Sequence, residues 1–156
     1  MGNLIVFKKG KKRAVNKLMC DAHTDEVGMI ITSITDDGFL LFEALGGIQT
    51  PSLVCKKVMI NGKVPGVIGI KPVHLCKGDE KSLLPKADSL YIDIGANSKE
   101  EAQKYVRVGD FATFISDFTE LGTDTVKAKA IDDRIGCAIL ISLLKQEAEY
   151  DFYATF

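Results

Sequence analysis

A histidine and several carboxylates lie directly behind apolar runs at two places far apart in this sequence. His23-Thr24-Asp25-Glu26 follows one run, and Asp132-Asp133-Arg134 follows another, just ahead of a helical pattern. Imidazole nitrogens and carboxylate oxygens are the ligands that zinc and related metals use in hydrolases. If two strand ends bring these residues together, they would form a metal-dependent hydrolase site.

Within the first cluster, His23 is the candidate metal ligand and Asp25 its support. A carboxylate two residues on can accept the other N–H of the ring and so orient the imidazole. The short motif also fits a turn in which Asp25 and Glu26 are solvated acids and His23 is an ordinary polar residue. Taken alone, it leaves both interpretations open.

The second cluster places two adjacent acids where a helix begins. One of them could simply cap the helix N-terminus. A cap explains only one acid, so we favour one carboxylate that bridges two metal ions, with the second acid and Arg134 fixing its geometry.

Composition argues against several other classes of protein. The 156 residues contain 20 Lys and Arg against 21 Asp and Glu, which gives no broad electrostatic case for nucleic acid or an anionic membrane as a partner. We interpret the basic run 8–13 as a solvated hairpin turn, and no apolar stretch is long enough to span a bilayer. The four cysteines are scattered without a CxxC pair, and no apolar leader precedes the first strand, so we expect a cytoplasmic protein with reduced thiols.

The periodicity of the chain predicts an α/β layer at its two ends and an all-β block between them. Residues 3–7 and 17–22 suit two neighbouring strands, and at the other end a strand at 126–131 precedes a helix at 134–149 and a strand at 152–156. We therefore expect a partial catalytic domain at 1–32 and 121–156, interrupted by a small β-barrel or sandwich at 33–120.

Two local signals are strong inside the β block. Asn61-Gly62 predicts a type I′ hairpin, and Pro65 in the returning strand must lie at an edge or near the strand's start. Ser98-Lys-Glu-Glu101 reads as a capping box ahead of a short helix at 99–106.

These residues together resemble the glutamyl and deblocking aminopeptidases that assemble as tetrahedral particles, members of which are often labelled endoglucanase or cellulase M. The resemblance covers essentially the whole chain. Besides the His23 to Gly28 segment, it rests on Gly46-Gly47, Gly66-Val-Ile-Gly69, Lys71-Pro72 with His74, Asp93-Ile-Gly-Ala96 with Ser98 and Glu100-Glu101, Gly109-Asp110, and Lys129-Ala-Ile-Asp-Asp-Arg-Ile-Gly136.

The resemblance implies a metallo-aminopeptidase with two zinc or cobalt ions that releases N-terminal residues from peptides. His23 would ligate one metal, Asp132 would bridge both, and Asp25 would be the supporting catalytic carboxylate. It also implies that the Asp132-Asp133 peptide is cis. The inserted β block would be a dimerisation domain through which the protein forms a homo-oligomer, and His74 in that block is not counted as a ligand.

The family pattern continues beyond Phe156 into a Glu-Glu pair, a further acidic ligand and a late histidine. We therefore expect this chain to be a fragment that binds metal weakly or not at all and is inactive by itself. Two alternatives stay open. The chain could be a non-catalytic oligomerisation module, or Asp25 and Asp132 could act as a glycosidase acid/base pair, although the chain has no Trp for a sugar-stacking platform.

Overall fold

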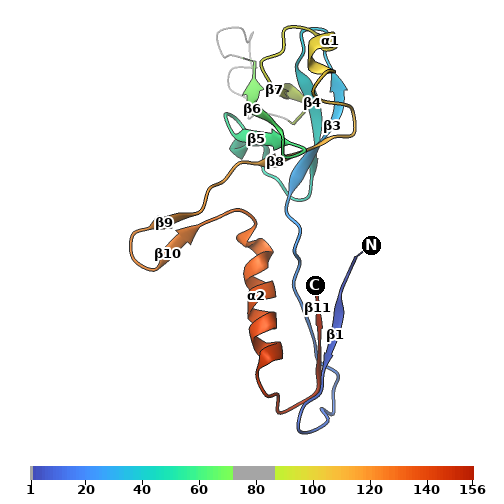
Figure 1. The fold of residues 1–156 in the computed structure, drawn as a ribbon, viewed down its shortest axis with the longest axis vertical. Helices are drawn as coiled ribbons and strands as arrows, with labels where there is room; N and C mark the ends of the chain where they lie inside the picture. Colours follow the sequence, from blue (N-terminus) through green and yellow to red (C-terminus); the bar gives the residue numbers. More distant parts are fainter. Residues whose placement is uncertain (1, 72–86) are drawn as a thin grey trace. The chain divides into compact units, whose positions relative to one another are not determined.

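The chain folds into two compact units, one inserted into the other. The computed structural model describes residues 2–71 and 87–156. The residues up to Glu26 and Phe118–Phe156 form the sheet–helix unit, and Val27–Asp117 forms the barrel unit (Figure 1). The observed divisions lie a few residues before the sequence boundaries at 32 and 120.

The earlier division after Glu26 follows from strand pairing. Strand β3 (Gly28–Ile34) is hydrogen-bonded to strand β4 (Leu40–Leu45) from its first residue, Gly28, to its last. All of β3 therefore belongs to the barrel unit, and a boundary inside it would break its pairing with β4.

Six antiparallel strands close into a barrel in the order β3-β4-β7-β6-β5-β8. Alternate residues point inward because the side chains of a strand alternate between its two faces. Met29, Ile31, Leu40, Ile68 and Ile92 are fully buried in this core. The other four strands are β5 (Lys57–Ile60), β6 (Val64–Ile70), β7 (Leu90–Asp93) and β8 (Phe111–Phe114).

The hairpin between β5 and β6 has the predicted turn. Asn61 and Gly62 both adopt positive φ, 48° and 67°, as a type I′ turn requires. Pro65 is the second residue of β6 and pairs with Met59, whereas the pairing of β6 with β7 begins only at Val67. The proline thus lies near the strand's start, which is the second of the two predicted positions.

Among the described residues of the barrel unit, the helices are short. They are η1 (Thr50–Ser52), η4 (Ala87–Ser89) and α1 (Lys99–Ala102). One half of the predicted capping box at α1 is present, since Ser98 Oγ accepts from the Glu101 amide at 3.2 Å. The Glu101 carboxylate accepts from the amide of Asn97 at 2.8 Å, one residue before the N-cap. The helix ends at Ala102 rather than continuing to 106 as predicted.

The sheet–helix unit is built on three strands in the order β1-β11-β2. They are β1 (Ile5–Lys8), β2 (Met19–Asp21) and β11 (Phe152–Thr155). The prediction that the first two strands are neighbours is wrong, because β11 lies between them, antiparallel to β1 and parallel to β2. The basic run after β1 is not a simple hairpin turn, since Lys11 and Lys12 form ion pairs with Glu147 and Glu149.

Helix α2 (Ile131–Lys145) packs beside this sheet, as Figure 1 shows. Cys137 and Leu140 of the helix form a small buried core with Ala22 and Ala154. The helix ends before the predicted residue 149, because the amides of Lys11 and Lys12 bind the carbonyls of Ala148 and Glu149 and hold that segment extended. Within the described residues, no helix combines the length and apolarity that crossing a membrane requires.

A small exposed hairpin precedes α2. It consists of β9 (Thr119–Leu121) and β10 (Thr125–Lys127). The strand predicted at 126–131 is therefore shorter, and Ala130 adopts a left-handed conformation with φ of 55° immediately before the helix. The α/β class with an inserted small β-barrel is confirmed.

Candidate metal site

The structure brings His23 and Asp132 together, although they are far apart in sequence. His23 follows β2, and Asp132 lies in the first turn of α2, where its backbone is not yet helical (φ −84°, ψ 109°). His23 Nε2 lies 3.4 Å from Asp132 Oδ1. Both side chains are open to solvent, with exposed fractions of 55% and 97%.

Asp25 approaches the other ring nitrogen of the same histidine. Its Oδ1 lies 3.1 Å and its backbone carbonyl 3.3 Å from Nδ1 of His23. A proton on Nδ1 is therefore donated to Asp25, which leaves the lone pair of Nε2 on the side of Asp132. A lone pair and a carboxylate oxygen repel each other unless a cation lies between them. The arrangement favours a proton or a metal ion at that position.

Electrostatics at His23 agree with this geometry. Desolvation opposes protonation, but the hydrogen bond with the Asp25 carbonyl and the charges of Asp25, Asp132 and Asp133 outweigh it, so the pKa of His23 is raised above its ordinary value. The surroundings of the ring thus attract positive charge. A metal ion would benefit from the same carboxylates.

Asp133 and Arg134 each form a hydrogen bond beside the two candidate ligands. Asp133 Oδ1 accepts from the amide of Gly136 at 3.1 Å, so this acid caps the regular part of α2. Arg134 Nε donates to the carbonyl of Thr24 at 2.9 Å. The Asp132-Asp133 peptide bond is cis, as the resemblance implied.

The spacing of the two candidate ligands fits one edge of a zinc site. Ligand atoms about 2.0–2.2 Å from a tetrahedral zinc ion are roughly 3.3–3.6 Å apart. The separation of 3.4 Å between His23 Nε2 and Asp132 Oδ1 lies within this interval. Among residues 2–71 and 87–156, however, no group of three or more His, Cys, Asp or Glu side chains could hold a metal. The described residues supply only part of a catalytic site, which commonly has three protein ligands.

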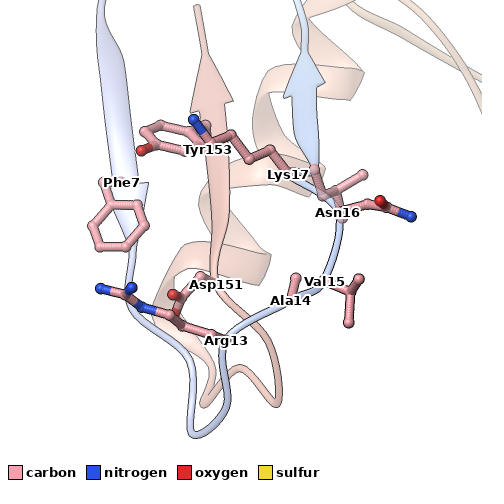
Figure 2. A pocket seen from close by; sticks show the side chains of 9 residues that line it. Phe7, Arg13, Ala14, Val15, Asn16, Lys17, Asp151 and Tyr153 are labelled. Atoms are coloured by element: carbon pink, nitrogen blue, oxygen red, sulfur yellow. The ribbon is translucent and has the colours of Figure 1, made fainter.

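A separate pocket of about 340 Å³ lies at the other end of β2 (Figure 2). It precedes the strand, whereas His23 follows it. Figure 2 shows Lys17 extending beside the ring of Tyr153, with Phe7 on the neighbouring strand. None of the candidate metal ligands lines this pocket. We therefore do not assign it to the metal site.

The motifs that form this site belong to a known family. Residues 2–156 match the sequence model of the M42 glutamyl aminopeptidase family. This chain is a member of that family. The match covers nearly the whole chain and includes both segments that meet at His23 and Asp132.

Curated relatives of this M42 member are aminopeptidases. It is 41% identical to a predicted aminopeptidase of Acetivibrio thermocellus, with 97% of this chain and 43% of the relative covered. It is 32% identical to the lysyl aminopeptidase of Pyrococcus furiosus, over 97% of this chain and 44% of that protein. The chain thus spans less than half the length of these relatives.

Solved structures resemble the M42 chain over its full length. The TET aminopeptidase of Thaumarchaeota archaeon SCGC AB-539-E09 is 34% identical with a TM-score of 0.87, over 99% of this chain and 46% of that one. The TET1 peptidase of Pyrococcus horikoshii, described as assembling into a tetrahedron or a large octahedral shell, is 38% identical with a TM-score of 0.79, over 99% and 48%. A Thermotoga maritima protein named as an endoglucanase is 38% identical with a TM-score of 0.76, over 99% and 46%.

Sequence reasoning missed one contact near the site. Lys129 Nζ lies 3.0 Å from Glu26 Oε1. The spacing of Glu26 in the first motif gave no sign of this partner, because only the fold brings the two segments together. His74, which was not counted as a metal ligand in the sequence analysis, lies outside the described residues.

Proposed function

We propose that this chain forms part of a metal-dependent aminopeptidase that removes N-terminal residues from peptides. The observation that carries the proposal is the 3.4 Å approach of His23 Nε2 to Asp132 Oδ1 in a member of the M42 family. Because the chain spans less than half of its relatives, the activity is proposed for the complete protein.

The chain's own residues would hold and orient the metal. His23 would bind through Nε2 and Asp132 through Oδ1, while Asp25 keeps the ring in one orientation and raises the basicity of its free nitrogen. Divalent metals in hydrolases polarise the scissile carbonyl and make water more acidic. The further ligands and a general base would come from outside the described residues.

We propose that the complete protein binds two metal ions, either zinc or cobalt, and that Asp132 is the carboxylate that would bridge them. The donor set supports this choice, because imidazole suits zinc and related transition metals better than it suits magnesium or calcium. The free thiols of Cys20, Cys55 and Cys137 agree with the proposed cytoplasmic location.

Glycoside hydrolysis is a weaker candidate, despite the name of the Thermotoga structure. A glycosidase needs two carboxyl groups separated by open space that takes a sugar or a water. Here the imidazole of His23 lies between Asp25 and Asp132, with one ring nitrogen near each acid. That arrangement suits a metal ligand with a supporting carboxylate.

We also propose that the complete protein is a homo-oligomer in which the barrel unit makes subunit contacts. The Pyrococcus horikoshii relative assembles into closed shells according to its description. A chain whose barrel unit supports assembly without catalysis is the alternative. The two differ in whether the His23 and Asp132 pair binds metal.

The experiment is a zinc titration and an anilide assay on the complete protein. Leucyl- and glutamyl-p-nitroanilide serve as substrates, with zinc or cobalt added to metal-free protein. We expect His23→Ala and Asp132→Asn to lose metal and activity. Asp37→Asn, an exposed carboxylate in a turn of the barrel unit, is the matched control and should keep both. Wild-type activity that persists without metal, or in His23→Ala, would overturn the proposal.

A further inference from the structure

Besides the approach of His23 to Asp132, three contacts join the two segments that carry these residues. Cys137 Sγ donates to the carbonyl of His23 at 3.4 Å, and Arg134 Nε donates to the carbonyl of Thr24 at 2.9 Å. The third is the ion pair of Glu26 with Lys129 at 3.0 Å. All of them lie within the sheet–helix unit.

From this arrangement we propose that Glu26 and Lys129 are positioning residues that set the separation of His23 and Asp132. The inference rests on the proposed function. Glu26 follows His23 by three residues, and Lys129 precedes Asp132 by three. The two segments are thus connected at two places. One is the ion pair of Glu26 with Lys129, and the other, three residues away along each segment, is the pair of candidate metal ligands.

The position of this ion pair distinguishes it from surface pairs. Glu26 is 19% exposed and Lys129 37% exposed, whereas Glu147, paired with Lys11, is 83% exposed. An exposed pair contributes little, because water and salt screen it. A largely covered carboxylate that loses its partner keeps its desolvation cost, so it moves or draws in water. Loss of the Glu26 charge therefore frees the segment that carries His23.

Metal binding would respond to such movement more than folding does. A separation near 3.4 Å between His23 Nε2 and Asp132 Oδ1 allows both atoms to reach one metal ion. If the two segments moved apart by about 1 Å, one of the two atoms would lie outside bonding range. Loss of groups that orient metal ligands typically costs 10- to 100-fold in metal affinity. We expect the loss of affinity on breaking the Glu26–Lys129 pair to be about ten-fold, because the hydrogen bonds of Arg134 and Cys137 still connect the two segments.

The test measures zinc affinity of the complete protein by competition with a chromophoric chelator. Glu26→Gln keeps the size of the side chain and removes its charge, and we expect about ten-fold weaker zinc binding. Glu147→Gln breaks the exposed pair with Lys11 and is the matched control, with unchanged affinity. The charge-reversed variant Glu26→Lys with Lys129→Glu should recover most of the loss. Visible absorption of the cobalt-loaded protein should change in Glu26→Gln and return in the reversed pair.

The outcomes separate this inference from the proposed function. Zinc affinity unchanged in Glu26→Gln but lost in His23→Ala would overturn the positioning role and leave the metal site in place. Zinc affinity unaffected by His23→Ala would overturn the proposed function itself. If Glu26→Gln does not fold, Lys129→Gln tests the same ion pair from its other side. About ten-fold weaker zinc binding is expected in that variant, and an unchanged affinity would overturn the positioning role.

Discussion

Asp25 places a carboxylate oxygen 3.1 Å from Nδ1 of His23, while Asp132 approaches the other nitrogen of the ring. The imidazole is therefore between two negative groups. In the absence of metal, the protonated ring satisfies both of them, because each ring nitrogen then carries a proton. A metal ion at Nε2 would take the place of that proton on the side of Asp132, and Asp25 would keep the ring in the orientation that binding needs.

Removing the charge of Asp25 should lower the pKa of His23. Desolvation already opposes protonation of the ring, and the charge of Asp25 is among the contributions that outweigh it. An NMR pH titration of the His23 ring protons in wild type and Asp25→Asn measures the change. Asp37→Asn is the control and should leave the titration unchanged. An equal pKa in wild type and Asp25→Asn would mean that Asp25 does not support the ring.

The same raised pKa gives stability a definite pH dependence. Because protonated His23 is favoured in the fold, its contribution is complete below the unfolded-state pKa and is lost as the pH rises through the folded-state pKa. As the pH rises from the unfolded-state pKa of His23 to its folded-state pKa, the urea midpoint of wild type should fall. The urea midpoint of Asp25→Asn should fall by less over the same interval. A larger loss in the variant would contradict this sign.

Asp133 should matter for the stability of α2 through its cap. Its Oδ1 accepts from the Gly136 amide, and loss of such a cap costs about 1 kcal/mol. Asp133→Ala should lower the free energy of unfolding by that amount. Asp133→Asn should lower it much less, because asparagine caps nearly as well as aspartate. Urea unfolding of both variants measures the difference, and equal losses would show that the charge rather than the cap is needed.

Much of the site could be predicted from the sequence because its residues lie at element ends. His23 and Asp25 follow a strand, and Asp132 lies in the first turn of a helix, so each was a candidate before the fold was known. The partner of Glu26 could not be predicted. Its ion pair with Lys129 depends on how two distant segments meet, and no local spacing encodes that.

Part of the fold could be predicted for the same reason. The Asn61-Gly62 turn depends on local backbone preference, and the structure has it. The place of β11 between β1 and β2 depends on long-range pairing, which apolar periodicity does not specify. Ala130 shows a second limit, because its positive φ at the start of α2 is a conformation that alanine rarely adopts.

The hydrogen bonds of Glu101 in α1 with Asn97 predict a pH-dependent stability of the barrel unit. Hydrogen bonds from the amide and side chain of Asn97 hold the pKa of Glu101 below its ordinary value. A lowered pKa gives stability that is present above the unfolded-state pKa and is lost as the pH falls through the folded-state pKa. Glu101→Gln should remove that acid-dependent part. Unfolding midpoints at neutral and acidic pH measure it, and an unchanged acid dependence would contradict the role of Glu101.

Gly66 on β6 should tolerate no side chain, because the barrel is closed around it. A Cβ at this position would lie 2.7 Å from Cγ2 of Ile92, which is fully buried, and 3.2 Å from the backbone oxygen of Asp93. Overpacking of this kind costs about 1–3 kcal/mol, so Gly66→Ala should lower the free energy of unfolding by that amount. Gly47→Ala is the control, since a Cβ there meets nothing within 4 Å. A Gly66→Ala variant as stable as wild type would mean that β6 and β7 can separate locally to admit the methyl group, and the barrel would then be less tightly packed at this strand pair than its buried residues indicate.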